Sequence, residues 1–351
     1  MGTVQDITVQ SDQLHKFAEK LYQKAGIGME HAKLMADLQV ETDLRNVHSH
    51  GTRMLPGYIW SILKGEINPT PQIHVVQEGS AFAVIDGDNG LGHPPSALAM
   101  KMAIEKAQSS GVAATGVRNA GHFGAAACYS MMAAEANMIG FSTTNTGRAT
   151  VVAPGGITPV TANNALSYAL PTGNGQPIVL DMACGASSWG KIGTLKMYGE
   201  PIPEDWLLNV EGQPTVDPGQ GPALMPAAGP RGYGLALTMG ILAGPLVGGL
   251  MACNKNRGEP SEHFFWAINV SSFTDFEEYI AEIDRGIRTI QASETMEDVD
   301  QVYLPGELEW HKREAWIANG IPLHVDHLKG LAGIAEELGV DIFWEWDATE
   351  N

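Results

Sequence analysis

The chain has 351 residues, 17% of them charged, and a formal net charge of −19. Its length allows one large or two moderate domains with a sizeable core, and a chain this acidic repels a phosphate backbone, which argues against a nucleic-acid partner. Its three cysteines, Cys128, Cys184 and Cys253, lack the spacing of disulfide or metal sites, which favours a reducing compartment. The start of the chain has no basic region followed by an apolar core, so we expect a cytoplasmic protein without a secretory signal.

The first part of the chain is predicted to be helical. Apolar residues recur at helical spacing over residues 14–25 and again over residues 34–44. A third helical run follows a polar break at residues 48–51 and ends at Gly65. Two prolines come next, so we predict an N-terminal helical segment over residues 1–72.

Strand and helix signals alternate in the middle of the chain. Strand signals fall at 73–76, 81–85, 112–117, 139–144, 177–180 and 264–270, and helical signals at 94–109, 124–136 and 276–290. Residues 86–90 are predicted as a turn, and residues 145–176 as loop-rich. This alternation predicts an α/β domain with a mixed sheet over residues 73–305.

One uncharged stretch, residues 233–253, is long enough to cross a bilayer. It also holds several glycines and Pro245, so we predict a closely packed buried helix that breaks near Pro245, and no membrane partner. The tail, residues 306–351, is predicted to be helical and to pack on the N-terminal segment. Its apolar stripe consists of Leu328, Leu331, Ile334, Ala335 and Leu338.

Two histidines and a serine, His48, Ser49 and His50, stand at the break between two helical runs, just before Gly51. Histidine suits proton transfer near neutral pH, so these side chains are candidates for acid–base catalysis. The same segment is also compatible with a plain polar turn. A third reading is a metal-dependent hydrolase or metal-binding module that uses His48, His50, His122 and Asp181 as nitrogen and oxygen ligands.

Further motifs extend over most of the chain. They include Leu55-Pro56 and Tyr58, His122-Phe123-Gly124-Ala125-Ala126, Ala153-Pro154-Gly155-Gly156, Asp181-Met182-Ala183, Gly190-Lys191, Gly232-Tyr233-Gly234 and Pro305-Gly306-Glu307. With Ser49-His50-Gly51, this order resembles the type 2 malate/L-lactate dehydrogenase family. That family also includes sulfolactate, ureidoglycolate, diketogulonate and cyclic-imine carboxylate dehydrogenases or reductases.

The resemblance implies hydride transfer between NAD or NADP and a small 2-hydroxy acid, 2-oxo acid or related substrate. It also implies a homodimer, and a cofactor domain that is not a Rossmann fold. The sequence agrees on the last point, because no Gly-x-Gly-x-x-Gly motif opens a helix after a strand. A non-catalytic member of the family stays open as an alternative.

The resemblance also assigns roles to individual residues. The implied catalytic residues are His50, Ser49 and His122. The implied cofactor contacts are His122, Phe123, Gly124, Ala125, Ala126, Thr146, Asp181, Met182, Ala183, Arg231, Gly306 and Glu307. The implied substrate contacts are Arg53, Met54, Tyr58, Gly190 and Lys191, and no metal is expected.

The sequence departs from the family pattern at the implied substrate site. Relatives usually read Ser-His-Gly-x-x-Arg, with the arginine placed to hold the substrate carboxylate. Here Met54 occupies that position and Arg53 precedes it. One residue turns a helical side chain by about 100°, so Arg53 is expected to point elsewhere. We therefore expect a pocket altered near Met54, and the sequence leaves the substrate and the choice between NAD and NADP open.

Overall fold

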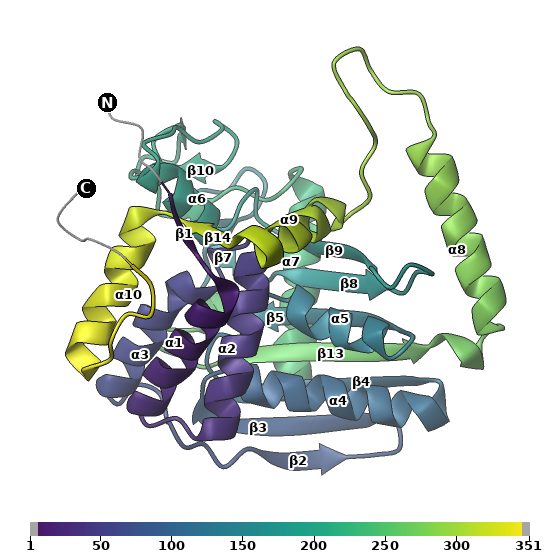
Figure 1. The fold of residues 1–351 in the computed structure, drawn as a ribbon, viewed down its shortest axis with the longest axis horizontal. Helices are drawn as coiled ribbons and strands as arrows, with labels where there is room; N and C mark the ends of the chain where they lie inside the picture. The colour runs from purple at the N-terminus through teal and green to yellow at the C-terminus, as the bar shows by residue number, and fades with distance from the viewer. Residues whose placement is uncertain (1–5, 346–351) are drawn as a thin grey trace.

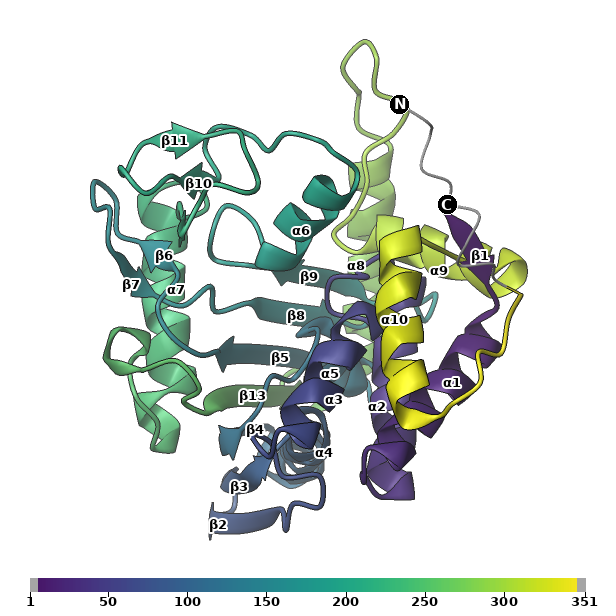
Figure 2. The same ribbon diagram turned by 90° about the vertical axis from the view of Figure 1, so that its left-hand side faces the viewer.

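The computed structural model describes residues 6–345, so the outer ends of the predicted N- and C-terminal segments lie outside it. A large β-sheet runs through the middle of the molecule, with helices on both faces (Figures 1 and 2). A smaller sheet lies at one side, and a group of helices from both ends of the chain lies at the other. The prediction of an α/β fold is confirmed.

The large sheet has seven strands in the order β2-β3-β4-β13-β5-β8-β9. They are β2 (His74–Glu78), β3 (Phe82–Gly90), β4 (Val112–Ala120), β5 (Met138–Asn145), β8 (Leu166–Leu170), β9 (Ile178–Met182) and β13 (Ser261–Asn269). Strands β3 and β4 are parallel and the other neighbours are antiparallel, so the sheet is mixed, as predicted. Helices α4 (His93–Ser110) and α5 (Ala127–Glu135) cover one face, and α7 (Pro230–Ala243) covers the other.

The predicted turn at residues 86–90 is instead the last part of β3. The turn-forming residues are still visible there, because Asp88 and Asn89 have positive φ angles of 50° and 54°. The pairing of β3 with β4 shifts register between Asp86 and Gly90. The polar cluster therefore makes an irregularity within a strand rather than the end of one.

The smaller sheet was not predicted from the sequence. Its five strands, in the order β11-β10-β12-β6-β7, are β6 (Val151–Val152), β7 (Pro159–Thr161), β10 (Leu207–Leu208), β11 (Pro214–Thr215) and β12 (Ala223–Leu224). Helix α6 (Trp189–Met197) packs beside it and shares its core through Ile192. Strands this short cannot show the alternation of apolar and polar residues on which a sequence-based prediction depends.

Helices from both ends of the chain share one apolar core. They are α1 (Ser11–Lys24), α2 (Met29–Leu44), α3 (Leu55–Leu63) and α10 (Val325–Leu338), joined by the antiparallel pair of β1 (Ile7–Val9) and β14 (Ile321–Leu323). The stripe residues Leu328, Leu331 and Ile334 lie in this core with Phe17 and Met35. Apolar burial thus brings the C-terminal helix back onto the N-terminal helices.

Helix α7 ends at Ala243, and a short 3-10 helix (Pro245–Val247) follows, so the predicted break at Pro245 is found. The prediction that this stretch is buried is only half right. Its sheet-facing side is buried, but Leu235, Ile241 and Leu246 on the other side are exposed. Within residues 6–345, no helix is both long enough and apolar enough to cross a membrane.

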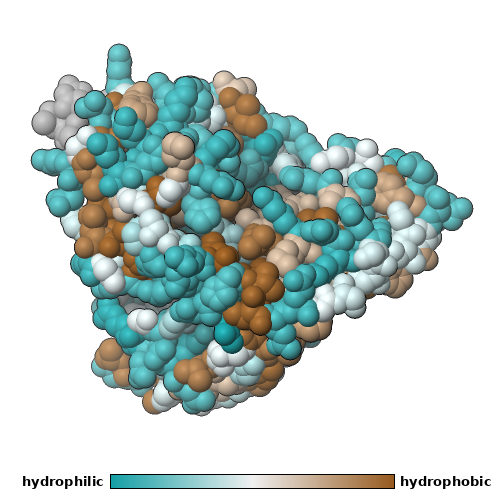
Figure 3. All heavy atoms as spheres, turned by 90° about the horizontal axis from the view of Figure 1, so that it is seen from below, coloured by the Kyte–Doolittle hydropathy of each residue, from teal (hydrophilic) through white to brown (hydrophobic). Residues whose placement is uncertain are grey.

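Two further helices follow the sheet. Helix α8 (Phe276–Gln291) has no buried residue and projects from the body as an arm (Figures 1 and 3). Helix α9 (Glu307–Asn319) returns the chain to the N-terminal helices, where Arg313 pairs with Glu41 of α2 at 2.7 Å. The three cysteines are unpaired in the structure.

Candidate active site

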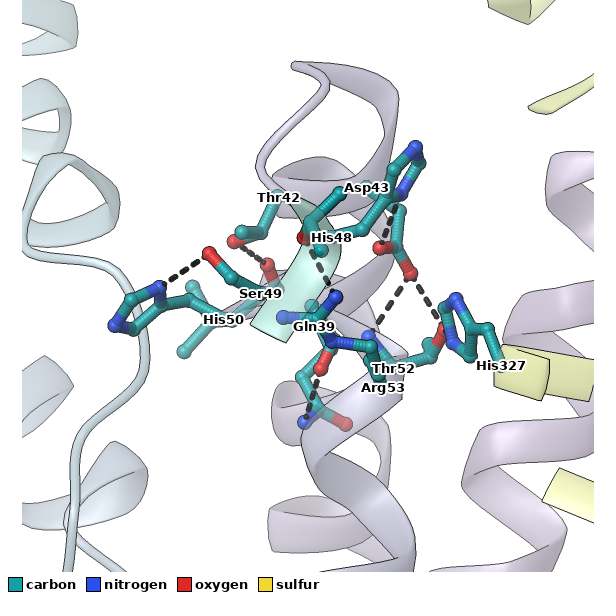
Figure 4. Close-up of polar contacts among 12 residues, drawn as sticks. Gln39, Thr42, Asp43, His48, Ser49, His50, Thr52, Arg53 and His327 are labelled. Atoms are coloured by element: carbon teal, nitrogen blue, oxygen red, sulfur yellow. Dashed lines mark hydrogen bonds and ion pairs between the residues drawn. The ribbon is translucent and has the colours of Figure 1, made fainter. Parts of the chain in front are cut away.

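A buried carboxylate holds the polar loop that follows α2. Asp43 accepts hydrogen bonds from the backbone N–H of Thr52 at 2.9 Å, from the Thr52 hydroxyl at 2.6 Å and from His48 Nδ1 at 2.9 Å (Figure 4). Gly51 packs so closely on this carboxylate that a Cβ would collide with it. The backbone carbonyl of Gly51 accepts a further bond, at 3.1 Å, from Gln39. These contacts fix the path of the segment that carries Ser49 and His50.

Burial acts to raise the pKa of Asp43, but the hydrogen bond and charge of His48, with help from His327 and Thr52, hold that pKa below its usual value. Asp43 is therefore a carboxylate at neutral pH. The Thr52 hydroxyl also lies 3.1 Å from His327 Nε2, which ties the loop to α10. Asp43 and His327 were not predicted from the sequence, because a lone acid at a helix end and a histidine on an apolar helix give no signal of their own.

His48 and His50 point to opposite sides of the loop (Figure 4). The His48 ring stacks on Trp316 with ring centroids 5.5 Å apart, whereas the His50 ring lies 5.6 Å from that of His122. In the part of the chain that the structure describes, no three metal-ligating side chains come together. The metal-site alternative built on His48, His50, His122 and Asp181 is therefore not supported.

His50 is half-buried, and its Nδ1 lies 2.9 Å from the hydroxyl of Ser49. Burial lowers the pKa of His50 to about 4, with a smaller contribution from the positive charge of Arg53. The imidazole is thus neutral at physiological pH and is able to accept a proton. The Ser49 contact orients the ring through Nδ1 and leaves Nε2 for a substrate.

His122 lies beside His50 and contacts two groups through Nδ1. The Tyr58 hydroxyl, on α3, is 2.6 Å away, and the backbone N–H of Gly124 donates to Nδ1 at 3.2 Å. Burial, with the nearby histidines His50, His93 and His263, holds the pKa of His122 well below its ordinary value. The structure thus brings the predicted residues His50, Ser49, His122 and Tyr58 together.

Arg53 faces α6. Its guanidinium donates to the Gly190 carbonyl at 2.6 Å and to the Thr194 hydroxyl at 2.7 Å. Gly190 packs directly against Ser49, so Arg53, Gly190 and Ser49 form one group. Met54 instead packs on the apolar core of the N-terminal helices. Residues Thr52–Met54 form a 3-10 helix, and there the side chains of Arg53 and Met54 separate, with Arg53 on the His50 side.

Lys191 lies on the same helix but is exposed, and its backbone N–H donates to the Ser188 hydroxyl at 3.0 Å. Arg231 is also exposed, in the first turn of α7, and Thr146 is half-buried just after β5. Among the described residues, neither Arg231 nor Thr146 makes a side-chain hydrogen bond to His50 or His122.

The implied cofactor residues of β9 and its neighbours do lie together. Asp181 accepts a hydrogen bond at 3.2 Å from the N–H of Ala127, the first residue of α5. Gly306, with φ of 85°, sits so close to Val179 that a Cβ would lie 2.9 Å from that side chain. Glu307 accepts a bond from the backbone N–H of Leu304 at 2.7 Å, which closes the turn before α9.

Not every implied cofactor residue has a side chain that is exposed to a ligand. Phe123 and Ala126 are buried, and the Phe123 ring stacks on His263 with centroids 4.4 Å apart. His263 bonds Thr144 at 2.8 Å and lies 3.0 Å from the Gly121 carbonyl, so it braces the segment that carries His122. His263 was not predicted from the sequence, because it lies far along the chain, on β13.

A separate cavity of about 580 Å³ lies against the smaller sheet. None of the predicted catalytic residues lines it. Its walls come from residues 152–157 and 225–229, with Ala186, Asp205, Trp206, Leu208 and Gly212. The histidine site and this cavity are therefore distinct features of the structure.

The chain is similar to known proteins over most of its length. The chain matches the malate/L-lactate dehydrogenase family over residues 9–332. The chain belongs to this family. It is 37% identical over 348 residues to a malate dehydrogenase of Pyrococcus abyssi, an alignment that covers 95% of this chain and 96% of the relative. It is 31% identical over 322 residues to a ureidoglycolate dehydrogenase (NAD(+)) of Escherichia coli O157:H7, covering 90% and 92%.

The fold agrees as well. The solved malate dehydrogenase of Pyrococcus horikoshii OT3 superposes with a TM-score of 0.87 at 35% identity, covering 96% of this chain and 97% of that one. The family resemblance seen in the sequence is thus confirmed, and the histidine site lies in the part of the chain that the family shares.

Proposed function

We propose that this chain is an NAD-type dehydrogenase that transfers a hydride between C2 of a small 2-hydroxy acid and the cofactor, with His50 as the acid–base group. This proposal rests on one observation. The hydrogen-bonded pair Ser49–His50 lies next to the hydrogen-bonded pair Tyr58–His122, beside the guanidinium of Arg53. The intact histidine pair, despite Met54, favours a catalytic protein over a non-catalytic family member.

In the oxidation direction, the substrate hydroxyl loses its proton to Nε2 of neutral His50, while Nδ1 donates to the Ser49 hydroxyl and keeps the ring in place. A bound nicotinamide cofactor supplies the hydride acceptor. In the reduction direction, protonated His50 returns the proton to the substrate oxygen. Arg53 and Gly190 lie on the Ser49 side, where a carboxylate is then held.

The residues around β9 fit such a cofactor. The carboxylate of Asp181, whose pKa is raised to about 6 by burial, is suited to accept ribose hydroxyl groups beside the first turn of α5. We infer that the cofactor binds on this mixed sheet and not on a Rossmann fold. As part of the same proposal, the chain divides into 1–72, 73–305 and 306–351, and the outer two segments pack together as one helical unit.

The pH dependence should follow His50. Because the His50 pKa is lowered to about 4, the neutral base is already present above about pH 5. We expect kcat/KM for oxidation to stay level from there to neutral pH and to fall only in more acidic buffer. In the reduction direction, the required proton is lost as pH rises, so kcat/KM should fall about tenfold per unit. Initial rates in both directions test this, and an oxidation inflection near the ordinary value of 6.5 would contradict it.

Arg53 is the cation expected to hold the substrate carboxylate. Removing it in Arg53→Ala should lower kcat/KM on 2-oxo acids by about 10–100-fold, the usual worth of hydrogen bonds to a charged group. Since Arg53 also anchors α6, Thr194→Val is the matched control, because it removes an α6 contact and keeps the charge. Thr194→Val should stay within about threefold of the wild type.

The sequence alone favours the opposite expectation, a pocket altered near Met54 that depends little on such a contact. In that case Met54→Arg, which restores the family pattern, should improve kcat/KM on pyruvate or oxaloacetate while Arg53→Ala changes little. Because Met54 packs on the helical core, we expect Met54→Arg to bring no gain. Comparing kcat/KM for the two variants separates these outcomes.

We also predict a homodimer. The charged fraction of 17% is low, and Leu235, Ile241, Leu246 and Leu250, on α7 and just after it, are exposed. Figure 3 shows further apolar patches among polar ones on the face below β2. Light scattering at micromolar concentration should give twice the mass of the chain, and a monomer at that concentration would overturn the prediction.

The experiment that tests the proposed function is a cofactor titration followed by a substrate screen. We expect the purified chain to bind NADH or NADPH and to reduce at least one 2-oxo acid or cyclic imine carboxylate. Absence of binding to both cofactors would refute the proposal, whereas binding without turnover would favour a non-catalytic member.

A further inference from the structure

His122 contacts two hydrogen-bond donors at the same ring nitrogen. The backbone N–H of Gly124 can only donate, and it points at Nδ1 from 3.2 Å. That nitrogen must therefore carry a lone pair and no proton. The Tyr58 hydroxyl, 2.6 Å from the same nitrogen, must then donate as well. Both contacts therefore require that Nδ1 of His122 carries no proton.

The local fold keeps this arrangement in place. Gly124 has φ of 80°, and a Cβ on it would lie 2.7 Å from Nε2 of buried His93. No other residue fits there without strain, so the direction of the Gly124 N–H is set by the backbone. Tyr58 is buried on α3, which fixes the position of its hydroxyl. Burial also raises the pKa of Tyr58, so the hydroxyl keeps its proton.

We infer that Tyr58 is a positioning residue that fixes His122 as the tautomer with its proton on Nε2, so that His122 meets the substrate oxygen as a hydrogen-bond donor and not as a second base. This rests on the proposed function, because it places His122 in the active site. A neutral imidazole has one N–H, and Nδ1 is excluded. Among the described residues, none bonds His122 Nε2, and its half-buried ring lies beside His50.

The two histidines then have different tasks. His50 carries its proton on Nδ1 toward Ser49 and uses Nε2 as the base, whereas His122 presents Nε2–H. Giving up that proton would leave an imidazolate, so His122 stabilises the negative charge that develops on the substrate oxygen without transferring a proton. A neutral histidine used in this way keeps its pKa low, as burial does here.

Three substitutions at His122 test the assignment. The amide of His122→Gln places an N–H donor near the position of Nε2 but has no basic nitrogen, whereas the amide of His122→Asn lies nearer Nδ1. We expect kcat to fall by less than about tenfold in His122→Gln, and by about 10²–10³-fold in His122→Asn and His122→Ala, as for loss of one charge-stabilising donor. Equal losses in all three variants would overturn the inference.

Tyr58→Phe tests the positioning role. It should lower kcat about tenfold in the wild-type background, with cofactor affinity unchanged, and by less than about twofold in the His122→Gln background, where no Nδ1 remains. Tyr279→Phe, on the projecting helix α8, is the matched control and should leave kcat unchanged. Equal effects of Tyr58→Phe in both backgrounds would show a merely structural role.

The tautomer of His122 is measured without an activity assay. In the ¹⁵N spectrum of the histidine-labelled full chain, the His122 signals are those lost in His122→Gln. We expect a protonated Nε2 and an unprotonated Nδ1. A proton on Nδ1 would overturn the inference even if the enzyme is active, and the expected pattern in a chain that turns over no substrate would refute the proposed function alone.

Discussion

Replacing His50 by alanine should lower kcat by about 10²–10⁴-fold, the usual contribution of a positioned acid or base. The neutral imidazole lies beside His122, and its Nδ1 is held by Ser49 at 2.9 Å. No other side chain of this group is equally free to accept a proton, because Nδ1 of His122 is already engaged by Tyr58 and Gly124. Cofactor affinity should change little, since His50 is not among the implied cofactor residues. Steady-state kinetics and a cofactor titration on the same preparation measure both quantities.

His74→Ala is the control for loss of a histidine, because His74 is exposed on the edge strand β2 and, among the described residues, its ring bonds just the backbone carbonyl of Gln72. It should leave kcat unchanged. Near-normal turnover of His50→Ala on the physiological substrate would move the acid–base role to His122, and the tautomer assigned to His122 would then be wrong as well.

Replacing Asp43 by alanine should cost about 3 kcal/mol of unfolding free energy and most of the activity. The substitution leaves the Thr52 N–H, the Thr52 hydroxyl and His48 Nδ1 without their shared acceptor in a fully buried place. The segment that carries Ser49 and His50 then loses the contacts that set its path. Urea unfolding followed by fluorescence measures the free energy of unfolding. The value of kcat/KM shows whether the segment that carries Ser49 and His50 keeps its position.

Asp37→Ala on the same helix is the matched control. Asp37 pairs with Lys33 at 2.7 Å and with His15 at 2.7 Å near the surface, so its removal should cost less than about 1 kcal/mol. If Asp43→Ala were no more destabilising than Asp37→Ala, the proposed role of the buried carboxylate would fail.

The stabilisation of the fold by Asp43 should also depend on pH, and it should be lost toward acid. The pKa of Asp43 in the folded state is below its usual value. Its ionised form therefore stabilises the fold at pH values above the pKa of the unfolded state, about 3.9. That contribution is lost as the pH falls through the lower pKa of the folded state. The stability gap between the wild type and Asp43→Asn should therefore be largest near neutral pH and close in acid.

The sequence predicted the elements whose patterns are long and regular. The stripe on α10, the helix break at Pro245 and six of the seven strands of the large sheet follow from apolar periodicity and proline chemistry. Strand β8 was missed, because it lies within residues 145–176, which were predicted as loop-rich. The smaller sheet was missed, because strands of two or three residues pair through the backbone and leave no periodic pattern.

The site residues that the family resemblance implied were predicted from the sequence, and the other residues of the site were not. His50 and His122 are far apart in the chain, and only the family motifs placed them together before the structure did. Asp43, His327 and His263 act through burial and through partners on distant elements, which a linear sequence does not show. Residues Thr52–Met54 form a 3-10 helix in which Arg53 reaches α6 and Met54 reaches the core, so Arg53 does point away from the direction of Met54. That Arg53 holds the substrate carboxylate stays a prediction.

The most direct test of the central claim is to follow the hydride itself. Reduction of an accepted 2-oxo acid with nicotinamide cofactor deuterated at C4 should yield a 2-hydroxy acid that carries deuterium on C2, detected by mass spectrometry, and His50→Ala should give the same labelled product more slowly. Product formed without deuterium from either face of the labelled cofactor would contradict hydride transfer at this site.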